Sequence, residues 1–126
     1  MERNSISNKE FAKELEQRTK KFAVQIIKLA SQLPKRPESK VISYQLVKSG
    51  TSIGANYREA NRSVSPADFK NKISICTKEA SETQYWLEVI IEADLISIEK
   101  TTNVHKECTE LLAIFTKIFQ TCKAKK

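Results

Sequence analysis

The sequence contains few of the residues that interrupt helices. Only two of its 126 residues are glycine and three are proline, well below the usual share of either residue. An all-β chain needs many tight turns, which glycine and proline preferentially occupy, so this scarcity argues against an all-β fold. With 40% apolar and 29% charged residues, the chain has the composition of a folded protein. Its length predicts a single domain over residues 1–126.

Long apolar segments are also missing. No apolar run approaches the roughly 18 residues of a transmembrane helix, and the N-terminal segment MERNSISNKEF lacks the apolar core of a signal peptide. The three cysteines, Cys76, Cys108 and Cys122, are odd in number and form no CxxC pair. We therefore expect free thiols in a cytoplasmic, reducing compartment and no membrane association.

Residues that catalyse reactions or bind cofactors are equally scarce. His105 is the single histidine and has no evident partner, and the cysteines fall on apolar stripes, where a thiol acts as a small hydrophobic group. The Glu-x-x-His motifs of a di-iron bundle do not occur, nor do a Gly-rich phosphate loop, G-x-S-x-G or H-E-x-x-H. The sequence therefore predicts no catalytic residue, no metal site and no cofactor, and a protein that is not an enzyme.

Apolar residues recur with the period of an α-helix in four consecutive segments. Short breaks separate these segments, and short connections favour antiparallel neighbours. Ser65 and Pro66 give the clearest helix start, because serine is a preferred N-cap and proline fits the first helical position. The pattern predicts an all-α, antiparallel up-down-up-down four-helix bundle. Its helices are expected at about residues 8–33, 39–61, 66–97 and 102–123.

Some residues outside the predicted core stripes have no role in a monomer. The third segment carries a second stripe of apolar and acidic residues, and the first carries apolar residues away from its core face. Two glycines in the second segment each cost about 1 kcal/mol of helix propensity relative to alanine and indicate close approach of another backbone. Large exposed apolar stripes are uncommon in monomers. The candidate oligomer interface comprises Val24, Ile27, Gly50, Gly54, Ile75, Glu79, Glu82, Trp86 and Val89.

A polar stripe with helical spacing lies beside the core stripe of the second segment. Ser52, Asn56 and Glu59 are its main members. We expect them to form a polar network between helices or between subunits. Buried networks of this kind specify register and partner more than they raise stability.

Positive charge is concentrated in one half of the chain. The formal net charge is +7, with 22 Lys and Arg against 15 Asp and Glu. Residues 1–62 hold 13 of the cations and 6 of the anions, whereas residues 63–126 hold nine of each. A basic surface attracts polyanions such as RNA and DNA, but it can also serve only to keep a protein soluble. Net charge alone leaves both interpretations open.

The first predicted helix and the break that follows it supply the candidate nucleic-acid-binding residues. No exposed aromatic platform for RNA bases is evident from the sequence. Binding would therefore be electrostatic and weakened by salt. The candidates are Lys9, Lys13, Lys20, Lys35 and Arg36.

Two sequence blocks resemble a known family. SGTSIGANYREA at residues 49–60, followed by SPADF at 65–69, resembles the signature of the bacterial four-helix bundle protein family. Members of this family are encoded in intervening sequences of 23S ribosomal RNA genes. KEASETQYWL at residues 78–87 resembles the second block of the family. The resemblance extends over about residues 10–120, and the first and last helices match it by pattern only.

The resemblance implies a compact bundle that assembles into a ring-like homopentamer, with no enzyme activity and no cofactor. Proteins similar to this family include an accessory factor of diversity-generating retroelements, which binds nucleic acid and a reverse transcriptase through its basic surface. The implied partners are therefore other copies of the chain, RNA or DNA, and a nucleic-acid enzyme. The resemblance assigns none of these contacts to named residues.

Two functions are compatible with these observations. The first is a non-enzymatic homo-oligomeric bundle that binds RNA or another nucleic acid electrostatically, as the basic first half indicates. The alternative is a protein-interaction scaffold with no direct nucleic-acid role, whose binding surface is the apolar and acidic stripe around Trp86.

Overall fold

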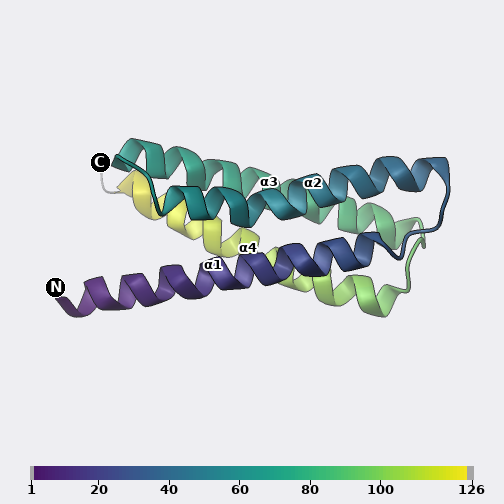
Figure 1. The fold of residues 1–126 in the computed structure, drawn as a ribbon, viewed down its shortest axis with the longest axis horizontal. Coiled ribbons are helices and arrows are strands. Elements are labelled where there is room, and N and C mark those ends of the chain that lie inside the picture. The colour runs from purple at the N-terminus through teal and green to yellow at the C-terminus, as the bar shows by residue number, and fades with distance from the viewer. Residues whose placement is uncertain (1, 125–126) are drawn as a thin grey trace.

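Four long helices make up the computed structural model, which describes the backbone of residues 2–124 and the side chains of residues 8–122. Successive helices run in opposite directions along the bundle (Figure 1). Each helix packs against its neighbours in sequence, and α1 also contacts α4. The predicted all-α four-helix bundle is confirmed. The helices are α1 (Glu2–Ala30), α2 (Pro37–Ala60), α3 (Pro66–Glu92) and α4 (Ile98–Ala124).

Both α2 and α3 begin at a proline. Ser65 caps α3 as predicted, because its Oγ accepts a hydrogen bond from the backbone N–H of Asp68 at 3.1 Å. Helix α2 begins at Pro37, two residues before the predicted start. Arg36 precedes Pro37 with extended backbone at φ −136° and ψ 157°, and proline at the first helical position has a φ suited to the helix.

The other boundaries differ from the prediction by a few residues. Helix α1 begins at Glu2 and ends at Ala30. Beyond the helix, the backbone N–H of Leu33 donates to the carbonyl of Ala30 at 3.1 Å. This turn buries Leu33, which is why the apolar pattern in the sequence extends past the end of the helix. Helix α4 begins at Ile98, four residues early.

Helix α3 ends at Glu92, five residues before its predicted end. Asp94 has a φ of 58°, in the left-handed region that glycine usually occupies at a helix end. The backbone N–H groups of Asp94 and Leu95 donate to the carbonyls of Ile91 and Ile90, each at 3.1 Å. These two bonds form a Schellman motif. Aspartate tolerates the left-handed conformation better than most residues, so the helix ends without the glycine that would have marked it in the sequence.

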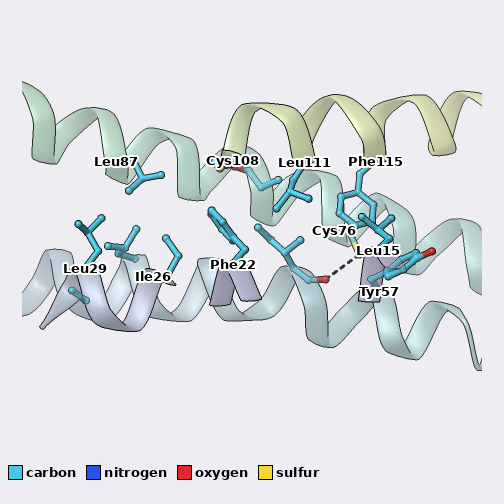
Figure 2. Packing of buried hydrophobic residues seen from close by; sticks show 14 of the residues in the cluster. Leu15, Phe22, Ile26, Leu29, Tyr57, Cys76, Leu87, Cys108, Leu111 and Phe115 are labelled. Carbon is cyan, nitrogen blue, oxygen red and sulfur yellow. Dashed lines mark hydrogen bonds between the residues drawn. The ribbon is translucent and has the colours of Figure 1, made fainter. Parts of the chain in front are cut away.

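The predicted apolar stripes meet in one core along the bundle axis (Figure 2). Burying each of these side chains contributes about 1.5–3 kcal/mol. The rings of Tyr57 and Phe115 pack edge to face, with centroids 5.4 Å apart. Cys76 and Cys108 lie in the same core, as predicted. The largest fully buried apolar side chains are Phe22, Phe115, Ile26, Leu46, Ile53, Ile73, Leu87, Ile90 and Leu111.

Both glycines lie where α2 approaches α1. A Cβ at Gly50 would lie 2.8 Å from Cγ1 and Cγ2 of Ile26, and one at Gly54 would lie 3.0 Å from Oγ1 of Thr19. The distance at Gly50 is shorter than a Cβ tolerates, and the distance at Gly54 is tighter than most Cβ contacts. A side chain at either position would therefore require α1 to shift. Gly50 and Gly54 therefore serve packing within the chain. Gly50 is buried against Ile26, so its assignment to an oligomer interface is corrected, whereas Gly54 is partly exposed and its assignment stays a prediction.

The close approach predicts that Gly50→Ala destabilises the protein. Overpacking against Ile26 costs about 1–3 kcal/mol, which exceeds the gain of about 1 kcal/mol in helix propensity. Chemical denaturation should show a lower free energy of unfolding. In an Ile26→Ala background the same substitution should be neutral or stabilising, and an equal loss in both backgrounds would contradict the proposed contact.

Candidate nucleic-acid interface

Five cationic side chains gather where α1 and α2 lie side by side. Lys9 and Lys13 line a shallow groove between α1 and the end of α2. Lys20 lines a second groove, of about 390 Å³, together with Arg58 and Arg62. Glu16 lines both grooves, so they adjoin. We call these five cations the α1–α2 basic face.

Helical spacing on both helices explains this grouping. Lys9, Lys13 and Lys20 are four and seven residues apart, so they project from one side of α1. Arg58 lies four residues after Gly54 and shares its side of α2, which is the side that meets α1. Arg62 follows in the turn after the helix. Sequence reasoning omitted both arginines, although the glycine at position 54 was a signal for the packed side of α2.

The α1–α2 basic face keeps most of its charge unpaired. Glu16 accepts a hydrogen bond from Nδ2 of Asn61 at 2.8 Å, and its other oxygen lies 3.8 Å from Nε of Arg58. The other four cations form no ion pair with a described residue. Cations therefore outnumber the two carboxylates, Glu16 and Glu59, that line the same grooves, and an excess of positive charge attracts polyanions.

Two cations elsewhere in the bundle, Arg18 and Lys72, are paired with carboxylates. Nε and Nη2 of Arg18 donate to Glu107 at 2.6 and 2.8 Å, and Nη2 also donates to Glu110 at 2.7 Å. These hydrogen bonds from α1 to α4 raise the pKa of Arg18 above its ordinary value. The Nζ of Lys72 lies 2.8 Å from Glu59, so the charge on both side chains is locally compensated.

Lys35 and Arg36 lie apart from the other predicted cations. They belong to the turn between α1 and α2, at the opposite end of the bundle from the start of α1 (Figure 1). There they line a cavity that Lys40 also lines. The five predicted nucleic-acid-binding residues therefore form two groups. Lys9, Lys13 and Lys20 lie along the α1–α2 basic face, and the other two lie in the turn.

The predicted polar network is local for two of its three members. Oγ of Ser52 donates to the carbonyl of Lys48 at 2.6 Å, and Nδ2 of Asn56 donates to the carbonyl of Ser52 at 2.8 Å. Both bonds stay within α2. Glu59 alone joins two helices within the chain, through its ion pair with Lys72.

A pair of buried hydroxyl groups makes the polar link between α2 and α3. Oγ1 of Thr83 donates to Oγ of Ser49 at 2.9 Å, and both residues are buried. The prediction placed Thr83 in the apolar core stripe, which is where it lies. Its position opposite Ser49 depends on how the two helices pack and could not be read from either helix alone.

The second stripe of α3 is half-buried in the isolated chain. Ile75, Glu79, Trp86 and Val89 all keep part of their surface exposed. Nε1 of Trp86 donates to Glu82 at 3.3 Å. Burial raises the pKa of Glu79, and the neighbouring charge of Glu82 raises it further. Two carboxylates this close to an indole ring form a surface that is both apolar and acidic.

The apolar residues on the outside of α1 are also accessible. Val24 is 45% exposed and Ile27 is 50% exposed. They continue the side of α1 that carries Lys13 and Lys20, towards the turn that follows the helix. The involvement of these two residues and of the second stripe of α3 in self-association stays a prediction.

The remaining candidate groups have structural partners. Sγ of Cys76 and Cys108 lie 3.5 and 3.3 Å from backbone carbonyls of Ile53 and Ala80. His105 has a partner that the sequence did not reveal. Its Nε2 lies 3.0 Å from a carboxylate oxygen of Glu88.

Within residues 8–122, no three His, Cys, Asp or Glu side chains are arranged to hold a metal ion. No helix in the described range is long and apolar enough to span a membrane.

Comparisons with known proteins support the architecture. The sequence matches the family described as 23S rRNA-intervening sequence protein over residues 8–117. A crystal structure from Bacteroides thetaiotaomicron, described as a protein of unknown function from the S23 ribosomal protein family, is similar with a TM-score of 0.77. The two sequences are 40% identical, and the similarity covers 82% of this chain and 96% of the other. The search of curated proteins found none that matches this sequence.

The buried thiols provide a test of this core. Burial raises the pKa of Cys76 and Cys108 to about 12, so only about one thiol in ten thousand is ionised at pH 8, and the thiolate is the reactive form. Alkylation at pH 8 followed by mass spectrometry should leave both residues unmodified in the native protein. In denaturant both should react at ordinary rates. Rapid native modification of Cys76 or Cys108 would contradict the packing.

Proposed function

The chain belongs to the 23S rRNA-intervening sequence protein family, and from this premise we propose that it is a non-enzymatic, homo-oligomeric RNA-binding protein. The observation that carries the proposal is the α1–α2 basic face, where five cations share one side of the bundle. Membership of the family does not by itself assign an activity, since the solved relative is described as a protein of unknown function.

The α1–α2 basic face has the dimensions of a nucleic-acid contact. From Lys9 to Lys20 it extends about 16 Å along α1, at 1.5 Å per residue. Cations spread over this length can meet several phosphates of one strand. Binding of this kind releases counterions from the nucleic acid, contributes affinity without reading sequence, and weakens steeply as salt is added.

Self-association would strengthen such binding. A ring needs two different patches on each subunit, because each copy contacts its two neighbours through different surfaces. The chain offers two, the half-buried second stripe of α3 and the exposed Val24 and Ile27 of α1. In the homopentamer that we propose, the formal charge of +7 per chain is repeated five times. Several weak contacts to one RNA then act together.

Nitrocellulose filter binding across a salt series tests the RNA proposal. The triple variant Lys13→Gln, Lys20→Gln, Arg62→Gln should weaken binding and make the affinity less dependent on salt, by about one unit of log–log slope per lost phosphate contact. The matched control changes three exposed lysines of α3 and α4, namely Lys78, Lys106 and Lys117. Equal losses in both triple variants, or no wild-type binding at low salt, would contradict the proposal.

Light-scattering mass tests the oligomer. Five copies of a 14.4-kDa chain have five times that mass, 72 kDa. Ile27→Glu should lower the mass without unfolding the bundle, because Ile27 is half exposed in the single chain. Val64→Glu is the control, since Val64 is 94% exposed and lies in a loop. A wild-type mass of 14.4 kDa would show that the chain is a monomer and refute the oligomer.

A protein-interaction scaffold remains a second candidate because of one observation. The stripe around Trp86 combines exposed apolar surface with Glu79 and Glu82, which suits a protein partner with an apolar and basic surface. This candidate requires the stripe to be free in the assembled protein. Pull-down with and without nuclease separates the two functions, since a partner that is lost on nuclease treatment was held by nucleic acid.

A further inference from the structure

The turn between α1 and α2 borders an open cavity with cationic walls. It measures about 670 Å³ and is lined by Lys35, Arg36 and Lys40, together with Ser39 and Tyr44. Cavities of a few hundred Å³ are the size that binds small organic ligands. The α1–α2 basic face lies outside it, so the cavity is a separate feature of the same two helices.

An unpaired buried hydroxyl lines this cavity. Ser39 is only 2% exposed, and its Oγ has no hydrogen-bond partner among the described residues. A buried polar atom without a partner costs about 1–3 kcal/mol, and native proteins contain few of them. The hydrogen-bonding capacity of this hydroxyl, in a residue that lines the cavity, is therefore unused within the described chain.

The start of α2 adds a second set of donors. The side chain of Arg36, at the N-cap, makes no capping hydrogen bond. The backbone N–H groups of Glu38 and Ser39 have no acceptor among the described residues. Free N–H groups at the positive end of a helix dipole bind anions, phosphate among them. The carboxylate of Glu38 is 3.5 Å from Nε of Arg36, and Glu38 is not part of the cavity wall.

An aromatic ring stands beside these donors. Tyr44 is 64% exposed and lines the same cavity. Nζ of Lys48 lies 5.9 Å from its ring centroid. The sequence indicated no exposed aromatic platform for RNA bases, but in the structure the ring of Tyr44 is exposed. An exposed tyrosine next to phosphate donors is the arrangement on which the bases of single-stranded nucleic acid stack.

We propose that this turn cavity binds one nucleotide of single-stranded RNA, with a phosphate at the start of α2 and the adjacent base stacked on Tyr44. The proposal rests on the RNA-binding function proposed above and adds to it a preference for unpaired RNA. The base must be unstacked from its neighbours to reach the ring, which a duplex does not allow. Phosphate alone would need only the cations and the helix start, so Tyr44 is what indicates a nucleotide.

Fluorescence anisotropy with the full chain tests the stacking. The probes are a labelled ten-residue oligouridylate and a labelled RNA duplex of the same length. Tyr44→Ala should weaken binding of the single strand about tenfold and leave the duplex unchanged. Tyr44→Phe should retain wild-type affinity, because it keeps the ring. Tyr85→Ala, which removes another exposed tyrosine on α3, is the matched control.

Two further measurements test the phosphate contact. Ser39→Ala should weaken single-strand binding about threefold without lowering the thermal midpoint, because the hydroxyl has no partner in the free protein. Uridine 5′-monophosphate should displace the oligouridylate at lower concentration than either uridine or inorganic phosphate. Displacement that is equal for inorganic phosphate and the nucleotide would overturn the stacking and leave an anion site only.

The outcomes separate this proposal from the one on which it rests. If wild-type protein binds the oligouridylate and Tyr44→Ala behaves like Tyr85→Ala, the turn cavity is not a nucleotide site, and the α1–α2 basic face still accounts for binding. If wild-type protein binds neither probe at low salt, both proposals are refuted.

Discussion

The close contact between α1 and α2 is the constraint on which the rest of the structure depends. Two helices pack at a distance set by the side chains between them, and α2 has no side chain at either of the two positions that face Ile26 and Thr19. The backbone of α2 therefore lies directly against these residues. As a result Lys20 on α1 and Arg58 on α2 line one groove, and the α1–α2 basic face is a product of core packing.

Carboxylates elsewhere in the bundle pair with Arg18 and Lys72, whereas most cations of the α1–α2 basic face have no ion-pair partner among the described residues. Acidic residues of α4 hold Arg18, and Glu88 on α3 faces His105. Pairs at the surface add little stability, but the two carboxylates cancel the charge of Arg18 where it lies. Between α1 and α2, Glu16 faces both grooves and Glu59, which is paired with Lys72, lines the second groove. The net charge of +7 is thus unevenly distributed over the surface, which composition alone does not show. A polyanion is attracted to the side where cations are in excess.

The sequence predicted features that depend on one helix at a time. The four helices, the core stripes and the cap at Ser65 all follow from local periodicity and local hydrogen bonds, and all are present. The end of α3 was missed because Asp94 adopts the left-handed conformation without being glycine. The apolar periodicity of a sequence does not show where a helix ends when the end is set by backbone conformation alone.

Features that depend on two helices were predicted less well. Helical spacing shows which side of a helix is buried but not which neighbour covers it, so the partner of Gly50 was placed in another subunit when it lies on α1. The sequence also grouped Lys35 with Lys9, although α1 separates them, with Lys9 near its start and Lys35 beyond its end. The site around Tyr44 could not be predicted, since a tyrosine beside a stripe is exposed or buried according to the neighbouring helix.

The central claim is that α1 and α2 together form the surface that meets RNA. Amide chemical-shift mapping of the full chain during titration with a single-stranded oligoribonucleotide tests it most directly. The structure predicts perturbations concentrated along α1, α2 and the turn between them, with α3 and α4 changing little. Perturbations centred on α3 and α4, or none at saturating RNA in low salt, would contradict it.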